Sequence, residues 1–188
     1  DCLEIVKKEI IEPLQEKGMR AKMLDKSKID LIFSNLVNIL EFHKLFYNEM
    51  KIKHNLEVIN RKLNKEHLKE KKYAYNPYSL FADSLYKFMD FFKLYNIYCP
   101  NYKLSLDERD RMKKDGHKFF KWMAEIENTP ALRLLDLDSL LIKPVQRLSK
   151  YKLMFQNLVN NTEASHPDYQ NLVKIYDKFV ALNKANNE

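Results

Sequence analysis

The chain has 188 residues, including 2 glycines and 6 prolines, and 33 Lys and Arg against 26 Asp and Glu give a formal net charge of +7. Its length suits one domain with a sizeable core, and so little glycine excludes the Gly-rich phosphate loops of Walker and Rossmann sites. No stretch approaches the roughly 18 uncharged apolar residues of a spanning helix, and no signal-peptide pattern is present. We therefore expect one soluble, cytoplasmic domain.

Cysteine and histidine spacing gives no sign of a metal site. Cys2 and Cys99 form no CxxC motif, and the five histidines never flank a carboxylate at i, i+4. We expect no metal, no cofactor and a reducing compartment. His43 continues an apolar helical stripe and is predicted to be half-buried, while neighbouring carboxylates such as Asp136 and Asp138 are interpreted as polar helix ends.

Much of the positive charge lies in residues 61–72, where six Lys and Arg stand against two Glu. Because this segment has few apolar anchors, we interpret it as a solvated helix end or connection. Contact with acidic lipid headgroups is the alternative. The local concentration of charge argues against a nucleic-acid partner.

Apolar residues recur at helical spacing along almost the whole chain, and no strand pattern intervenes. Residues 3–14 predict a first helix that Pro13 bends or ends. A second, long helix is expected over residues 29–50, with Ser27 and Asp30 as its capping pair.

The middle of the chain predicts further helices. After a turn at Asn76-Pro77, Ser79 is expected to cap a helix that ends before Pro100. Ser105 is expected to begin another through a capping box, and Gly116 marks a break before a helical face over residues 119–126.

Two helices are expected near the end of the chain, one from Pro144 to about Asn161 and one opened by Pro167. Together, about six main helices with short connections predict an all-α, elongated helical bundle. The predicted core includes Leu36, Ile39, Phe88, Phe120, Leu148, Phe155 and Phe179.

The helix that begins at Pro144 has two different faces. At 100° per residue, its core side contains Val145, Leu148, Tyr151, Phe155, Leu158 and Val159. The opposite side contains Gln146, Lys150, Leu153 and Asn157, flanked by Arg147 and Met154. A mixture of amide, cation and large apolar groups is typical of a protein-binding surface. A solvated face with two incidental apolar residues is the alternative.

The same helix carries a family motif. The run LDSLLIKPVQRLSKY over residues 137–151, followed by HPDY at residues 166–169, closely resembles the third conserved region of Dbl-homology (DH) domains, the exchange factors for Rho-family GTPases. A similar resemblance covers residues 32–35 with 39–43, and residues 95–102 followed by 119–127. It spans nearly the whole chain in family order.

The resemblance implies an elongated helical bundle that docks on both switch regions of a Rho, Rac or Cdc42-type small GTPase, expels magnesium and distorts the phosphate site. Such a domain is a guanine nucleotide exchange factor without covalent chemistry, which accelerates GDP release because it holds the nucleotide-free GTPase most tightly. A helical binding module without exchange activity is the alternative.

The resemblance also implies which residues bind the GTPase. The glutamine and lysine of the family's QRxxKY motif face the GTPase and correspond to Gln146 and Lys150, the pair that helical spacing places away from the core. Leu153 and Asn157 share that face and complete the expected surface.

The family's last helix carries an Asn before an acidic residue that meets switch II. This role falls on Asn187 and Glu188, with Asn186 as the alternative. The family's switch I glutamate falls just before Asp1, and Lys152 replaces the usual proline after the Lys-Tyr pair.

Residues 1–188 are accordingly expected to form a DH domain that lacks its extreme N-terminal residues, with no pleckstrin-homology (PH) domain within the chain. An adjacent PH domain would supply any contact with an anionic membrane. That contact would recruit the protein to the inner face of the plasma membrane.

Overall fold

The computed structural model describes residues 2–16, 22–67, 81–132 and 135–187, with side chains described except in 57–67 and 187. Within these ranges the chain is helical and contains no strand, which confirms the all-α class. The elements are α1 (Cys2–Ile5), the π-helical turn η1 (Val6–Ile11), α2 (Glu12–Gln15), α3 (Lys26–Phe33), α4 (Leu36–His67), α5 (Phe81–Phe88), the 3-10 helix η4 (Met89–Leu94), α6 (Tyr95–Lys114), α7 (Lys118–Glu127), α8 (Leu137–Leu141), α9 (Lys143–Asn160) and α10 (Tyr169–Asn187).

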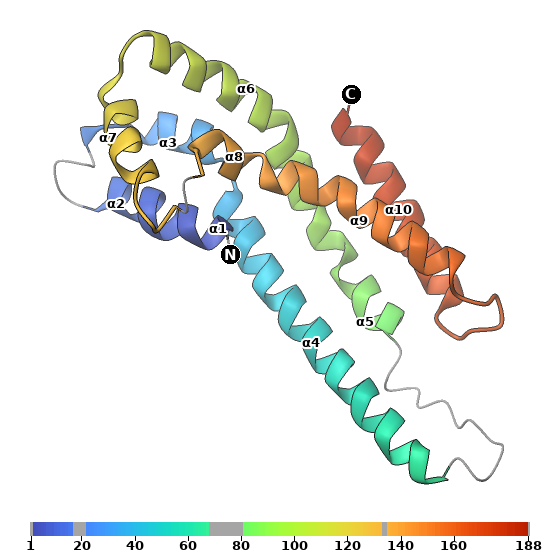
Figure 1. The fold of residues 1–188 in the computed structure, drawn as a ribbon. Coiled ribbons are helices and arrows are strands. Elements are labelled where there is room, and N and C mark those ends of the chain that lie inside the picture. Colours follow the sequence, from blue (N-terminus) through green and yellow to red (C-terminus); the bar gives the residue numbers. More distant parts are fainter. Residues whose placement is uncertain (1, 17–21, 68–80, 133–134, 188) are drawn as a thin grey trace.

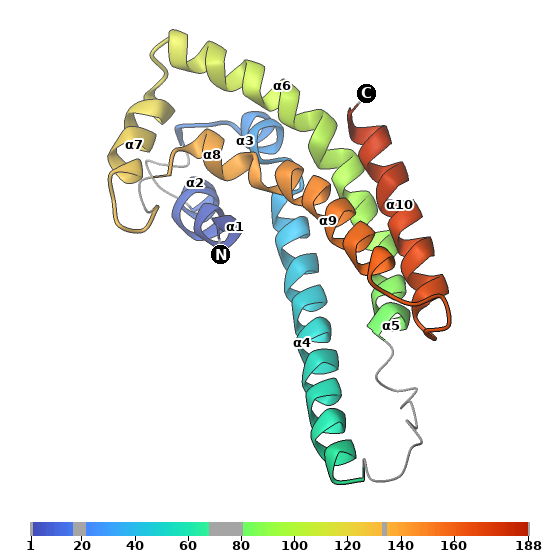
Figure 2. The ribbon, with the colours of Figure 1, turned by 45° about the vertical axis from the view of Figure 1, so that its right-hand side comes forward.

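The helices form an elongated bundle, as expected. Helices α6, α9 and α10 pack against one another, and α5 packs against both α4 and α10. The shorter helices α1, α2, α3, α7 and α8 gather at one end (Figure 1). From that end α4 and α9 diverge, which is visible in both views (Figure 2).

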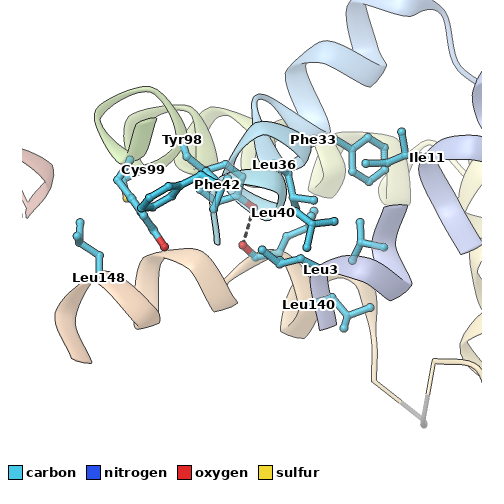
Figure 3. Packing of buried hydrophobic residues seen from close by; sticks show 14 of the residues in the cluster. Leu3, Ile11, Phe33, Leu36, Leu40, Phe42, Tyr98, Cys99, Leu140 and Leu148 are labelled. Atoms are coloured by element: carbon cyan, nitrogen blue, oxygen red, sulfur yellow. Dashed lines mark hydrogen bonds between the residues drawn. The ribbon is translucent and has the colours of Figure 1, made fainter. Parts of the chain in front are cut away.

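One core runs from the short helices into the long ones. Leu3 of α1 lies beside Leu40 of α4 and Leu140 of α8 (Figure 3), and the Tyr98 hydroxyl of α6 donates a 2.7 Å hydrogen bond to the Leu141 carbonyl. The prediction of burial is confirmed for Leu36, Ile39, Leu148, Phe155 and Phe179. Phe88 and Phe120 are only partly buried and pack against the edge of this core.

The first predicted helix differs little from expectation. It runs through η1 and continues past Pro13, which lies in the first turn of α2. Just before it, the Glu12 backbone N–H donates to the Lys7 carbonyl, so the π-helical turn runs directly into α2. The backbone leaves the helical region at Glu16, where ψ is 145°.

The predicted long helix over residues 29–50 is confirmed from Leu36 onward as α4, but its predicted start is wrong, because the chain breaks between α3 and α4. Ser34 has a φ of 49°, and the neighbouring Asn35 amide donates a 2.9 Å hydrogen bond to the Leu94 carbonyl. The cap is also displaced: Asp25, not Ser27, accepts a hydrogen bond from a first-turn backbone amide, and Ser27 donates to Asp25.

The predicted helix end before Pro100 and the predicted cap at Ser105 are also wrong, since α6 contains both residues. Ser105 is buried and donates to the Ile32 carbonyl (2.9 Å), and Asn101 donates to the Leu31 carbonyl (2.8 Å). These two carbonyls belong to the last turn of α3, where acceptors have no partner within the helix. The polar side chains of α6 therefore provide hydrogen-bond donors for the free carbonyls at the end of α3.

The remaining boundaries agree with the sequence analysis. Gly116 has a φ of 64° between α6 and α7, and α9 and α10 cover the expected segments. In the basic segment, residues 61–67 continue α4, while their side chains and residues 68–72 lie outside the description. The predicted turn at Asn76-Pro77 and cap at Ser79 also lie outside the described residues.

Candidate functional site

Helix α9 packs against the rest of the bundle through one of its faces. Leu148, Tyr151 and Phe155 are buried, and Phe179 of α10 stacks on Phe155 with ring centroids 5.0 Å apart. Val145 and Val159, also predicted on the core side, are partly buried and pack against the core. The same prediction for Leu158 is wrong: its side chain is 39% exposed. Its side chain borders the space between α4 and α9.

The opposite face of α9 is open to solvent, as predicted. Gln146, Lys150, Leu153 and Asn157 are all exposed, and they follow one another at steps of four, three and four residues. Leu153 is 57% exposed and the flanking Met154 is 49% exposed. Lys150 forms no ion pair within the described part of the chain. This face is therefore free to meet a partner.

The end of α10 is described only in part. The side chain of Asn187 and the whole of Glu188 lie outside the described residues. The Asn186 amide donates to the Asn96 side-chain oxygen (2.9 Å) and to the Leu182 carbonyl (2.7 Å). The bond to Asn96 ties the end of α10 to the beginning of α6.

A groove of about 660 Å³ lies between α4 and α9, with α1 at one end. Gln146 and Lys150 form part of its α9 side, so the expected binding face and the groove are continuous. Helical spacing alone does not predict this groove, because Tyr47 and Met50 of α4 continue an apolar stripe that is typical of a core. In the structure Tyr47 is 64% exposed and lines the groove instead.

His43 joins α4 to the binding helix. Its Nε2 lies 2.7 Å from the Tyr95 hydroxyl, its Nδ1 lies 3.3 Å from the Tyr151 hydroxyl, and its ring stacks on that of Tyr151. Burial, with a smaller contribution from the nearby Arg147 cation, lowers the pKa of His43 to about 4. The expected half-buried position is thus confirmed, and the imidazole is neutral at pH 7.

This arrangement makes stability depend on pH. Because the folded pKa is about 4 and the unfolded value is near 6.5, His43 stabilises the fold fully above about pH 6.5, and this stability is lost as the pH falls toward 4. Between pH 7 and pH 4.5, the free energy of unfolding of the wild-type protein should fall by about 2 kcal/mol more than that of a His43→Phe variant, as measured by urea unfolding. The carboxylates titrate in both proteins, so their contributions to the pH dependence cancel in this comparison. Parallel stability curves would contradict the assignment.

Comparison with known proteins identifies the family. The model of the RhoGEF domain matches residues 1–187. The chain belongs to this family. It is 29% identical over 171 residues to the kinase and exchange factor for Rac B of Dictyostelium discoideum, covering 89% of this chain and 14% of that protein. It is 29% identical over 165 residues to human Rho guanine nucleotide exchange factor TIAM2, covering 87% of this chain and 9% of that protein. The RhoGEF chain thus spans less than a fifth of either relative.

Solved structures have the same fold. An activated truncation of Vav1 in its apo form superposes with a TM-score of 0.76 at 23% identity, covering 100% of this chain and 42% of that chain. The DH/PH domains of PDZ-RhoGEF, in a complex with activated RhoA, give a TM-score of 0.75 at 20% identity, covering 99% and 48%. These likenesses confirm the DH-type bundle that the motif implied.

Two features are absent from the part of the RhoGEF chain that the structure describes, a metal-ligand cluster and a membrane-spanning helix. No cluster of three or more His, Cys, Asp and Glu side chains that would suit a metal ion occurs among the described residues. No described helix is both long and apolar enough to cross a bilayer. The exposed face of α9 is therefore the candidate site.

Proposed function

We propose that this RhoGEF domain is a guanine nucleotide exchange factor for a Rho-family small GTPase and that it acts through the two switch regions. The observation that carries the proposal is the exposed face of α9. There Gln146 and Lys150, which the motif resemblance assigns to the family's GTPase-facing pair, are exposed and point away from the core. Leu153 and Asn157 extend that face by about two further turns, so one helix supplies both the apolar contact area and the polar groups that fix the register of binding.

Exchange needs no covalent step. A domain that binds the nucleotide-free GTPase more tightly than the nucleotide-bound form lowers the barrier to GDP release, and GTP loading then expels the domain. Lys150 supplies a charge-assisted hydrogen bond to an acidic or carbonyl oxygen that is well placed only in the nucleotide-free arrangement. Its lack of an ion pair in the described part of the chain supports this role, because no internal bond must break first.

The second contact lies at the end of α10. We assign it to Asn187 and Glu188 rather than to Asn186, since the Asn186 amide already donates to Asn96 and to Leu182. A side chain with both N–H groups engaged has less to offer a partner. The bond from Asn186 to Asn96 instead holds the end of α10 against α6.

The proposal is tested by fluorescent-GDP release from a panel of Rho, Rac and Cdc42-type GTPases. We expect the domain to accelerate release from at least one member, and to bind that GTPase best when no nucleotide is present. Binding that is indifferent to nucleotide, with release at the intrinsic rate for every member, would instead make the domain a binding module without exchange activity.

A further inference from the structure

The groove between α4 and α9 has the size and lining of a small-molecule site. Its volume of about 660 Å³ lies within the roughly 300–1,000 Å³ typical of ligand pockets, which are mostly apolar with a few polar groups. Side chains of α1, α4, α5, α6 and α9 line it, and its apolar lining includes Leu3, Leu40, Phe46, Met50, Met154 and Leu158. Several of these side chains keep apolar surface exposed to water, and a ligand that covered them would gain free energy.

The charged groups that line the groove are all positive. They are Lys143, Arg147 and Lys150, which lie on one side of α9 at steps of four and three residues. None of them forms an ion pair with a residue that the structure describes, and no carboxylate is among the described lining residues. The Arg147 guanidinium lies over the Tyr151 ring, 4.6 Å from its centroid.

We propose that this groove binds an anionic amphiphile: a single aliphatic chain that ends in a carboxylate. The chain would cover the apolar floor that α4 and α9 provide, and the carboxylate would lie beside Lys143 and Arg147. A neutral apolar ligand would leave these cations without a counter-charge, and a polyanion such as a nucleotide would leave the floor uncovered. The lining therefore favours a ligand with one apolar part and one anionic end.

Occupation of the groove has a consequence that rests on the proposed function. Gln146 and Lys150 line the groove and also form the proposed GTPase-binding face. A ligand that neutralises or covers them competes with the GTPase, so it should slow GDP release. The groove would then couple exchange to the concentration of a free amphiphile.

Binding is measured directly, without a GTPase, by calorimetric titration of the domain with dodecanoate below its micellar concentration. Dodecanol and dodecyltrimethylammonium are the matched probes, because they keep the chain and change only the head. We expect saturable one-to-one binding of dodecanoate, at least about tenfold tighter than binding of either control, since charge-assisted hydrogen bonds are the strong ones. Circular dichroism checks that the helices remain intact.

Two variants on α4 separate groove binding from general adsorption. Tyr47 and Leu45 are each 64% exposed, but only Tyr47 lines the groove. Tyr47→Glu places a negative charge within it and should weaken dodecanoate binding at least about fivefold. Leu45→Glu should leave the affinity unchanged. Neither residue belongs to the proposed GTPase-binding face.

The absence of saturable binding, equal affinity for the three head groups, or equal effects of the two substitutions would overturn the proposal. Where the domain accelerates GDP release but binds no dodecanoate, only the groove proposal fails. Where dodecanoate binds as expected but no GTPase releases GDP faster, the groove proposal holds and the proposed function fails. If the domain accelerates GDP release and saturating dodecanoate leaves that rate unchanged, the ligand does not compete with the GTPase and this part of the proposal is overturned.

Discussion

Replacing Asp138 by Ala should lower the free energy of unfolding by about 3–5 kcal/mol, because it leaves a buried cation without its partner. Arg109 is 0% exposed, and its Nε donates a 2.8 Å hydrogen bond to Asp138. A second guanidinium nitrogen donates to Ser105, and Lys113 approaches the other Asp138 oxygen at 2.6 Å. Thermal and urea unfolding monitored by circular dichroism would measure the loss.

A neighbouring carboxylate provides the control. Asp136 caps α8 by accepting a 2.7 Å hydrogen bond from the Ser139 amide, so Asp136→Ala should cost only about 1 kcal/mol, as lost N-caps do. Adding Arg109→Met to Asp138→Ala should recover much of the stability, because the double variant no longer buries an unpaired charge. If the two single Asp variants lose equal stability, the buried pair does not have the role assigned to it.

These two carboxylates also show what local sequence can reveal. Both were interpreted as polar helix ends, and this is right for Asp136, whose partner is three residues away. It misses the main role of Asp138, whose partner Arg109 lies 29 residues earlier on another helix. No periodicity or capping rule relates positions so far apart.

The helix boundaries show the same contrast between local features, which spacing predicts, and distant contacts, which it misses. Spacing alone identified the segments of α7, α9 and α10, where caps and breaks are local. It missed the break at Ser34, which the bond from Asn35 to Leu94 accompanies, and it placed a cap at Ser105, which instead satisfies the Ile32 carbonyl. Each error reflects a hydrogen bond that forms only when distant helices pack.

The candidate site likewise has one part that the sequence predicts and one part that it does not. The exposed face of α9 could be predicted from the angular positions of Gln146, Lys150, Leu153 and Asn157 along one helix. The groove beside it could not, because its existence depends on how far α4 diverges from α9. Tyr47 and Leu158 both line this groove and are exposed, although helical spacing places Leu158 on the core side.

Replacing Lys150 by Ala should slow GDP release at least about tenfold, and Gln146→Ala should act in the same direction. Both side chains are exposed on α9, so each substitution should change stability by less than about 0.5 kcal/mol. The loss of a charge-assisted bond that forms only in the nucleotide-free complex removes roughly 1.4 kcal/mol or more, which is a factor of ten in rate. Fluorescent-GDP release on the preferred GTPase measures the rate, and urea unfolding measures stability.

Lys152 provides the matched control, because it carries the same charge on the same helix but lies outside the proposed binding face. Lys152→Ala should leave the exchange rate within about twofold of the wild-type rate, because a surface charge that does not touch the partner contributes little to binding. An equal loss in the Lys150 and Lys152 variants would attribute the effect to net charge rather than to a specific contact. A Lys150→Ala protein that unfolds would show a structural role for this lysine, and one that folds normally and exchanges at the wild-type rate would remove Lys150 from the mechanism.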